Sequence, residues 1–289
     1  MSNELLICTD LDRTLIPNGP ESESEGAREK FRMLASRDEV RIAYVSGRHR
    51  ELVEQAIRNY CLPVPDFVIG DVGTTIYSVG ESQQWSRDRE WEQKIALDWA
   101  GKTHADLRAL LSDIKDLRTQ ELFKQNDYKL SYYVPLNGDK ERLANQIHQR
   151  FRESGIHANL IWSVDEPAGV GLLDILPGSA SKYHAIETLM HHQGFTYEDT
   201  VFCGDSGNDL EVLASPVPAV LVANSQTEIQ QLAQSIAEKT GHFEQLYLAR
   251  GGFMGMNGNY SAGMLEGIAH YHPRVSDWLS EHAGESALS

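Results

Sequence analysis

The sequence predicts an α/β fold: a Rossmann-like core built on a parallel sheet, with a smaller α+β domain inserted into it. At both ends of the chain, short apolar runs alternate with segments of helical periodicity. This alternation is typical of a parallel sheet that helices cover on both faces. Between about residues 80 and 170, charged helical segments surround a polar and aromatic strand, which indicates a sheet with one open face. We therefore expect a discontinuous core over residues 1–79 and 171–289, and an inserted domain over residues 80–170.

The individual elements follow from the length of each run and from the residues that bound it. Apolar runs between turn-forming residues predict core strands over residues 5–9, 41–45, 67–69, 172–176, 200–203 and 219–222. Helical periodicity predicts core helices over residues 26–36, 51–60, 182–192, 210–214 and 262–270. Pro63 and Gly194 end the second and third of these helices, since proline and glycine terminate helices. Inside the insert we expect helices near 94–99 and 139–153, and a strand over 128–134.

The composition limits the classes of function. Of 289 residues, 41% are hydrophobic and 24% are charged, which excludes a disordered or fibrous chain. The 26 Lys and Arg residues against 42 Asp and Glu give a net charge of −16. An acidic chain without a basic surface is not expected to bind nucleic acid or anionic lipid. If its substrate is an anion, positive charge must be supplied locally, most simply by a bound cation.

Targeting and redox signals indicate the cytoplasm. No window approaches the roughly 18 uninterrupted apolar residues of a membrane span, and the N-terminus lacks the basic start and cleavage site of a signal peptide. The three cysteines, Cys8, Cys61 and Cys203, are widely spaced, so we expect buried packing in a reducing compartment and no disulfide framework. We therefore expect a cytoplasmic protein with no membrane partner.

Four polar clusters mark the expected functional end of the sheet, since ligands of open parallel sheets bind beyond the carboxyl ends of the strands. The first cluster holds Asp10 and Asp12, directly after the first strand. Two carboxylates at this spacing suit a nucleophile and a general acid or base, with a divalent cation that keeps one ionised. The alternative is a simple turn, because Asp is common in turns.

The second and third clusters suit an anion. Ser46, Gly47 and Arg48 follow a strand and open a helix, where a hydroxyl and bare N–H groups can bind a phosphate. The alternative for Ser46 is a plain helix N-cap. Lys182 lies in the first turn of a helix, where its charge opposes the helix dipole, so a phosphate-binding role and a structural role both remain open.

The fourth cluster supplies oxygen ligands. The segment from Gly204 contains Asp205, Asn208 and Asp209 on a glycine-rich turn. Such oxygens suit a hard cation such as Mg²⁺. An Asx-type turn is the alternative, although its two carboxylates repel each other unless a cation is present.

Taken in order, these clusters resemble the four motifs of the haloacid dehalogenase (HAD) superfamily. Asp10 and Asp12 match the first motif, Ser46 the second and Lys182 the third, and Asp205 with Asp209 match the fourth. The insert between the second and third motifs is similar to the type-IIB cap of this superfamily.

The resemblance narrows to the sucrose-phosphate phosphatase family. Besides the fourth motif, the family pattern is echoed in Gly73-Thr74, Asp174-Ile-Leu-Pro-Gly, Val222-Ala-Asn224-Ser-Gln226 and Ser261-Ala-Gly263. This chain has Thr75 where the family has Glu after Gly-Thr, and the segment 82–122 aligns only loosely.

The resemblance implies a Mg²⁺-dependent phosphatase that acts on a sugar phosphate, with sucrose 6-phosphate as the expected substrate. Asp10 would be the nucleophile that forms an aspartyl-phosphate, and Asp12 the general acid and base. The metal ligands would be Asp10, the backbone carbonyl of Asp12, and Asp205, supported by Asp209 and Asn208. Phosphate contacts would come from Ser46, Gly47 and Lys182. Further substrate-binding candidates are Arg48, Gly73, Thr74, Lys129, Asn208 and Asn224.

The insert would close over the site and choose the sugar. Four of the five tryptophans, Trp85, Trp91, Trp99 and Trp162, lie in it, and their rings suit sugar stacking or core packing. Other functions remain open: a phosphatase for mannosylfructose phosphate or mannosyl-3-phosphoglycerate, a hexose-phosphate mutase, or a catalytically silent partner of a sucrose-phosphate synthase. Such a synthase is also a candidate partner of the active enzyme.

Overall fold

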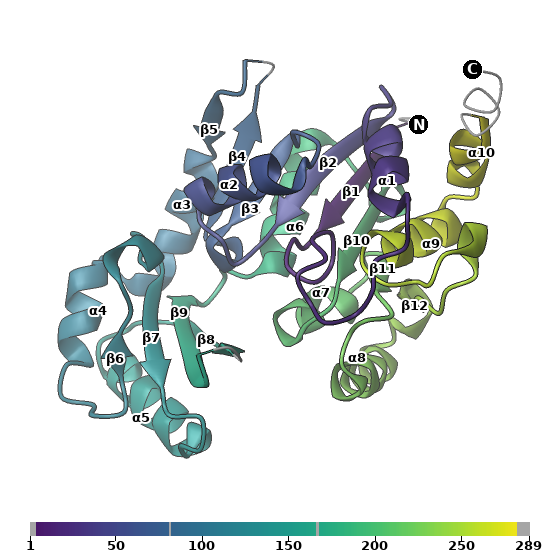
Figure 1. Ribbon diagram of the computed structural model, residues 1–289. Coiled ribbons are helices and arrows are strands. Elements are labelled where there is room, and N and C mark those ends of the chain that lie inside the picture. Colours follow the sequence, from purple (N-terminus) through teal and green to yellow (C-terminus); the bar gives the residue numbers. More distant parts are fainter. Residues whose placement is uncertain (1–3, 81, 166–167, 282–289) are drawn as a thin grey trace.

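The computed structural model describes residues 4–80, 82–165 and 168–281 and contains two sheets (Figure 1). The main sheet has eight strands in the order β12-β11-β10-β1-β2-β3-β4-β5. Its strands are β1 (Leu5–Thr9), β2 (Val40–Val45), β3 (Phe67–Gly70), β4 (Thr75–Val79), β5 (Trp85–Arg87), β10 (Thr200–Gly204), β11 (Ala219–Leu221) and β12 (Leu246–Leu248). The pairs from β12 to β3 are parallel, whereas β4 and β5 are added antiparallel.

Helices cover both faces of the main sheet. One face carries α1 (Ala27–Ala35), α2 (Arg50–Tyr60), α9 (Ser261–Tyr271) and α10 (Arg274–Glu281). The other face carries α3 (Arg89–Ala96), α6 (Lys182–Gln193), α7 (Leu210–Leu213) and α8 (Thr227–Thr240). Leu5 and Ile7 of β1 pack on the first face, and Leu6 and Cys8 pack on the second, as the two-residue period of a strand requires. The layered α/β class expected from the sequence is therefore confirmed.

The second sheet is smaller and antiparallel, in the order β6-β7-β9-β8. Its strands are β6 (Arg118–Thr119), β7 (Leu130–Val134), β8 (Ala158–Asp165) and β9 (Val170–Pro177). The helices α4 (His104–Leu110) and α5 (Lys140–Glu153) pack on one face, where Leu107, Ile147 and Phe151 contribute to its core. We call this sheet with its two helices the cap. In Figure 1 it stands apart from the layers of the main sheet.

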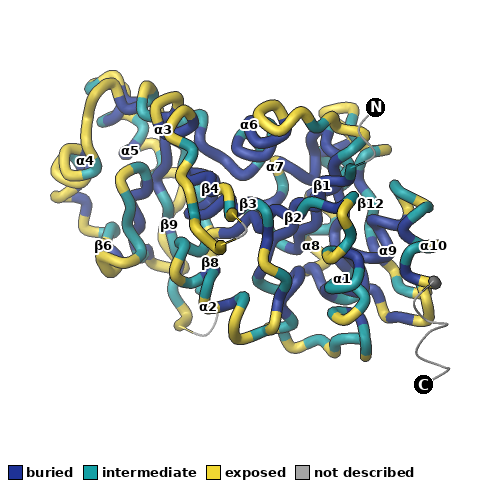
Figure 2. Tube along the Cα trace, turned by 90° about the horizontal axis from the view of Figure 1, so that it is seen from above, coloured by how far each residue is buried: buried dark blue, intermediate teal, exposed yellow. Residues whose placement is uncertain are grey.

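Short 3-10 turns connect these elements. They are η1 (Asp71–Gly73), η2 (Leu97–Trp99), η3 (Leu122–Lys124), η4 (Tyr197–Asp199), η5 (Gly207–Asp209), η6 (Phe243–Gln245) and η7 (Phe253–Gly255). Figure 2 shows the pattern of burial: the strands of the main sheet are largely buried, and exposed residues concentrate on the outer helices and loops.

The strand expected over residues 172–176 exists as β9, but its expected place in the parallel sheet is wrong. β9 pairs antiparallel with β7 and β8 in the cap. Its residues alternate: Leu173 and Ile175 lie in the cap core, while Leu172 and Asp174 face a pocket. The short apolar run suggested burial on both faces, but one face of this strand is the wall of a site.

The expected insert begins at residue 80, but the first elements after that residue belong to the main domain. β5 belongs to the main sheet, and Trp91 and Ile95 of α3 pack in the core beside it. Trp99 is the first of the expected insert's tryptophans to lie in the cap core. We propose that the inserted unit comprises residues 97–177, because this stretch contains the strands and the core of the second sheet.

The remaining expectations differ in detail. The expected strand over 128–134 begins at Leu130, and α10 was not expected. Cys8 and Cys203 are buried, but the expected burial of Cys61 is wrong: it is exposed and ends α2 with a left-handed φ of 52°. Among the described residues, no helix has the length and apolar character needed to span a membrane.

Candidate functional site

A pocket of about 330 Å³ lies where the carboxyl ends of the central strands face the cap. From the main sheet it is lined by Asp10, Asp12, Arg13, Ser46, Gly47, Arg48, Asp205, Ser206 and Asn208, among others. From the cap it is lined by Gln120, Lys124, Lys129, Ser131, Ile161, Ser163, Leu172 and Asp174. The fold thus brings three of the four predicted clusters to the surface of one pocket, opposite a largely polar wall.

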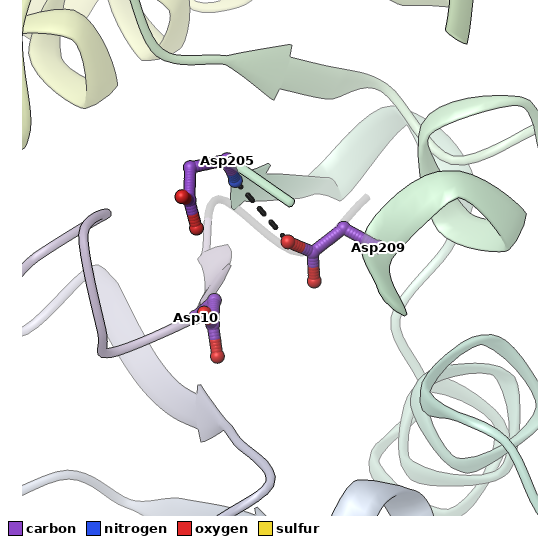
Figure 3. Close-up of side chains that lie close together, drawn as sticks. All are labelled: Asp10, Asp205 and Asp209. Atoms are coloured by element: carbon purple, nitrogen blue, oxygen red, sulfur yellow. Dashed lines mark hydrogen bonds between the residues drawn. The ribbon is translucent and has the colours of Figure 1, made fainter. Parts of the chain in front are cut away.

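Three buried carboxylates converge beside this pocket (Figure 3). Asp10 follows β1 and Asp205 follows β10; these strands are parallel neighbours, with Thr9 opposite Cys203, so their ends bring the two carboxylates together. Asp209 ends η5, and its Oδ2 accepts a hydrogen bond of 3.1 Å from the backbone N–H of Asp205. One carboxylate oxygen from each lies within 4.8 Å of the others.

Lys182 enters this cluster from the first turn of α6. Its Nζ lies 2.7 Å from Oδ1 of Asp209 and 3.1 Å from Oδ1 of Asp10, and its side chain is 1% exposed. Burial lowers the pKa of Lys182, but the charges of Asp10 and Asp209 outweigh this, so the pKa is raised and the ammonium stays charged. The third predicted cluster therefore lies directly beneath the pocket.

The carboxylates exceed the cations around them. Besides Lys182, only Arg13 among the described residues approaches the three acids, with its Nε 3.4 Å from Oδ2 of Asp205. Burial and the negative charge of Asp209 raise the pKa of Asp205 to about 7, and burial raises that of Asp10 despite Lys182. Oxygen donors with uncompensated negative charge fit a hard divalent cation.

Asp10, Asp205 and Asp209 differ in how many hydrogen bonds their carboxylate oxygens already accept. Asp209 Oδ1 accepts a hydrogen bond from Lys182, and Oδ2 accepts from Ser206 and from the backbone at 205–206. This arrangement leaves Asp10 and Asp205 better placed to bind a cation directly, with Asp209 as a support for Lys182 and for the turn.

Asp12 is held separately by a charged fork. Arg48 donates hydrogen bonds of 2.7 and 2.5 Å to its two oxygens, and Asn18 donates one of 2.7 Å. Burial raises the pKa of Asp12, but the hydrogen bonds and charge of Arg48 outweigh it, so the pKa lies below its usual value. The sequence suggested Arg48 as a substrate contact, but its pairing with Asp12, 36 positions away, was not expected.

The loop from Ser46 to Arg48 presents the hydroxyl of Ser46 and the backbone N–H of Gly47, while the N–H of Ser46 donates to the carbonyl of Ile69. Ser46 follows β2 and is 1% exposed, and its Oγ accepts a 3.3 Å hydrogen bond from the N–H of Arg48. The alternative role of Ser46 as a helix N-cap is wrong, because the residue that caps α2 is His49. Because Ser46 Oγ only accepts this bond, its O–H and the N–H of Gly47 are the donors that an anion in the pocket would meet.

Besides Lys182, three predicted substrate contacts lie outside the described pocket lining: Gly73, Thr74 and Asn224. Asn224 uses its side chain to donate to the Arg13 carbonyl at 2.7 Å and to accept from the N–H of Tyr260 at 2.8 Å. Thr74 bonds to the carbonyl of Asp71, and Gly73 packs against backbone at the start of α6. Of the three, Asn224 is bonded through its side chain to a residue of the pocket wall, Arg13. By contrast, Lys129 lines the pocket, and Asn208 both lines it and accepts a 3.1 Å hydrogen bond from Lys182.

The cap wall was largely missed. Gln120, Lys124, Ser131 and Asp174 line the pocket, and for Asp174 a signal existed, because it is the polar residue between two buried positions of β9. None of the tryptophans, all of which are described, lines this pocket. Trp91 lies in the core of the main domain and Trp99 in the core of the cap, and both are at most 1% exposed, so their apolar area is used for packing.

The comparisons with known proteins identify the family. The family model of sucrose-6F-phosphate phosphohydrolase matches residues 3–272. The chain belongs to this family. It is a HAD phosphatase and a phosphoric monoester hydrolase, as the resemblance implied.

Two related proteins and one solved structure are similar to this chain. A Nitrosococcus oceani protein, named only as a HAD-like hydrolase, is 54% identical over 287 residues, which are 99% of this chain and 77% of that protein. Sucrose-phosphatase 2 of Nicotiana tabacum is 29% identical over 78% of this chain, which spans 52% of the tobacco protein. The structure of the Synechocystis sucrose-phosphatase in complex with sucrose and phosphate matches with a TM-score of 0.74 and 25% identity, over 93% of this chain and 98% of that one.

Proposed function

We propose that this protein hydrolyses sucrose 6-phosphate to sucrose and inorganic phosphate, with Mg²⁺ as cofactor and an aspartyl-phosphate on Asp10 as intermediate. The observation that carries the proposal is the placement of Asp10: it is buried beside Lys182, at the bottom of a pocket whose opposite wall is polar. Membership of the family and similarity to the Synechocystis enzyme support the sugar phosphate as substrate.

The metal site fits Mg²⁺ in its chemistry. Asp10, the backbone carbonyl of Asp12, and Asp205 would hold the ion, with Asp209 and Asn208 in support. When bound, the cation offsets the repulsion between the Asp10 carboxylate and the phosphate dianion.

The residues of the chain would act on phosphorus in two steps. Ser46, the N–H of Gly47, and Lys182 bind the phosphoryl oxygens while a carboxylate oxygen of Asp10 attacks the phosphorus. The bond from phosphorus to the sugar oxygen breaks, and Asp12 donates a proton to that oxygen. Asp12 then takes a proton from water, which attacks the aspartyl-phosphate, releases phosphate and restores Asp10.

Arg48 would control the pKa of the general acid, Asp12. The free enzyme holds Asp12 as a carboxylate, because both of its oxygens are bonded to Arg48. A phosphate dianion in the pocket competes for Arg48 and repels the ionised form of Asp12. Both effects raise the pKa of Asp12 toward the range in which a carboxyl group can donate a proton.

The cap residues that line the pocket would bind the sugar and determine which sugar is accepted. Lys129 offers an ammonium there and Asp174 a carboxylate, whereas Gln120 and Ser131 line the same wall with side chains that already donate to the Tyr132 carbonyl and to Asp174. Donors and acceptors in alternation suit a neutral polyhydroxyl group, whose hydroxyls both donate and accept. We propose Lys129 and Asp174 as the principal sugar contacts.

Phosphate release tests this function. The purified chain is assayed with and without Mg²⁺ on sucrose 6-phosphate, other hexose phosphates and mannosylfructose phosphate, with Asp10→Asn as the blank. We expect Mg²⁺-dependent release that is at least about tenfold faster on sucrose 6-phosphate and absent from the blank. Release mainly from another glycosyl phosphate would keep the chemistry and overturn the sucrose assignment. No release from any substrate would favour a silent partner of a synthase.

A further inference from the structure

A buried ion pair joins the cap to the main sheet near the pocket. Lys129, just before β7, places its Nζ 2.8 Å from Oδ1 of Asp71 in η1, and the two side chains are 6% and 4% exposed. Lys129 lines the pocket, whereas Asp71 lies behind it. Within the described structure this Asp71 oxygen has no aligned hydrogen-bond partner, so the two residues are held as a close ion pair.

The turn that carries Asp71 is strained. Asp71 and Val72 both adopt left-handed backbone conformations, with φ values of 52° and 62°. This region is unfavourable for a β-branched residue such as Val72 and persists only where surrounding structure imposes it. Strain of this kind clusters at functional sites, which makes the turn a candidate for a role beyond packing.

Hydrogen bonds fix the strained turn to the phosphate-binding loop. The N–H of Asp71 donates to the carbonyl of Arg48 at 3.0 Å, and the N–H of Val72 donates to the carbonyl of Ser46 at 3.1 Å. On the other side, Trp91 Nε1 donates to the carbonyl of Gly73 at 3.0 Å. The turn therefore holds the loop that carries the Ser46 hydroxyl and the Gly47 N–H, both from residues that line the pocket.

The turn also rests on the helix that carries Lys182. A Cβ built on Gly73 would lie 2.4 Å from the carbonyl carbon of Ser181 and 2.8 Å from the backbone nitrogen of Lys182. The position of Asp71 is thus determined by both phosphate-binding elements, the Ser46 loop and the start of α6.

We infer that Asp71 is a positioning residue: it fixes Lys129 against the pocket and sets the distance between the sugar-reading wall of the cap and the phosphate-binding loop. The inference rests on the proposed function, and it deepens that function by assigning sugar selectivity to a residue that does not touch the substrate. Asp174 supports the same arrangement from the cap, since Ser131 donates a 2.5 Å hydrogen bond to it beside Lys129.

The test compares two substrates in the full chain with Mg²⁺ present. Sucrose 6-phosphate needs both ends of the pocket, whereas p-nitrophenyl phosphate has no sugar hydroxyls and reports on the core chemistry alone. We expect Asp71→Asn to raise KM for sucrose 6-phosphate by about tenfold. We expect kcat for this substrate, and both constants for the aryl phosphate, to stay within about twofold. Equal losses on both substrates, or no loss on either, would overturn the inference.

A second set of variants shows whether Asp71 acts through Lys129. We expect Lys129→Gln to raise KM for sucrose 6-phosphate to a similar extent and Asp71→Asn added to it to cause no further rise, because the pair acts as a unit. Additive effects would refute the role through Lys129. The double variant removes both charges of the Asp71–Lys129 pair together, so it provides the comparison if Asp71→Asn alone fails to fold.

The controls separate this inference from the proposed function. Asp113→Asn removes an exposed carboxylate that pairs with Arg150 in the cap, and we expect it to change neither substrate's constants. If the wild-type chain prefers another sugar phosphate, the sucrose assignment fails, and the selective rise in KM is then expected on that substrate. A wild-type chain that hydrolyses only the aryl phosphate would refute both.

Discussion

Arg48 binds both carboxylate oxygens of Asp12, with Nε 2.7 Å from Oδ2 and Nη2 2.5 Å from Oδ1. A guanidinium is planar and matches a carboxylate with two parallel hydrogen bonds. The pair therefore fixes the orientation of Asp12 at the rim of the pocket as well as its charge, and it makes Arg48 part of the acid–base machinery that we propose.

We predict that Arg48→Ala lowers kcat for sucrose 6-phosphate by about 10- to 100-fold, because the orientation of the general acid is lost. The loss should be much smaller for p-nitrophenyl phosphate, whose phenolate leaves without a proton. Arg48→Lys should restore little, since an ammonium cannot make the fork. Steady-state kinetics on both substrates test this. Equal losses on both would place the effect of Arg48 on a step that the two substrates share, either phosphate binding or hydrolysis of the aspartyl-phosphate, and would contradict its role in orienting the general acid.

Removal of the metal should destabilise the fold and abolish activity. Mg²⁺ at 100 times its dissociation constant is expected to stabilise the wild type by about 2.7 kcal/mol, because it neutralises buried carboxylates. Asp205→Asn should raise the Mg²⁺ concentration needed for half-maximal thermal stabilisation by at least about tenfold. Thermal unfolding at a series of Mg²⁺ concentrations measures this, with Asp113→Asn as a control. An unchanged midpoint in EDTA and Mg²⁺ would contradict the metal site.

Asp174 should make stability depend on pH. Burial raises its pKa, and this outweighs the opposing effects of Lys129 and Ser131. The folded state then holds the proton more tightly than the unfolded chain. The resulting stabilisation is present below the ordinary carboxyl pKa of about 3.9 and is lost as pH rises through the higher folded pKa. Asp174→Asn cannot ionise, so its stability relative to the wild type should improve as pH rises.

Thermal midpoints of both proteins between pH 4 and pH 8 test the effect of Asp174. The amide oxygen of the variant can still accept the hydrogen bond from Ser131, and any change in that bond shifts the variant by a similar amount at every pH, so the trend with pH isolates the ionisation. A difference that stays constant, or that favours the wild type more at pH 8, would contradict the raised pKa. Activity on the sugar phosphate should fall, because the same carboxylate is a proposed sugar contact.

Gly73→Ala should destabilise the chain by about 2–4 kcal/mol. The residue has a φ of +99°, and an added Cβ would lie 2.4 Å from backbone atoms of Ser181, which cannot rotate away. Gly26→Ala is the matched control: its φ is +74°, but nothing lies within 4 Å of the added atom. Its cost should be about 1 kcal/mol. Urea unfolding of both variants decides whether the close approach, rather than the backbone angle, makes the difference.

The alternation of apolar runs with helical segments was enough to predict the α/β class, and the polar clusters after the predicted strands were enough to predict at which edge of the sheet the site lies. Asp10, Ser46 and Asp205 each follow a buried strand, and the carboxyl ends of parallel strands lie on one edge of a sheet. Local apolar patterns therefore placed these groups near one another without knowledge of the tertiary contacts.

The three-dimensional packing was needed for everything that depends on partners distant in sequence. The pairing of β9 in the cap, the fork between Arg48 and Asp12, and the contact of Lys129 with Asp71 join segments that no local pattern relates. An apolar run of five residues does not distinguish a strand buried on two faces from one whose second face lines a pocket. The wall of the pocket opposite β9 comes from the main sheet, whose strands are distant from β9 in sequence. The role of Asn224 also depends on a distant partner, because its side chain donates to the carbonyl of Arg13 and does not line the pocket.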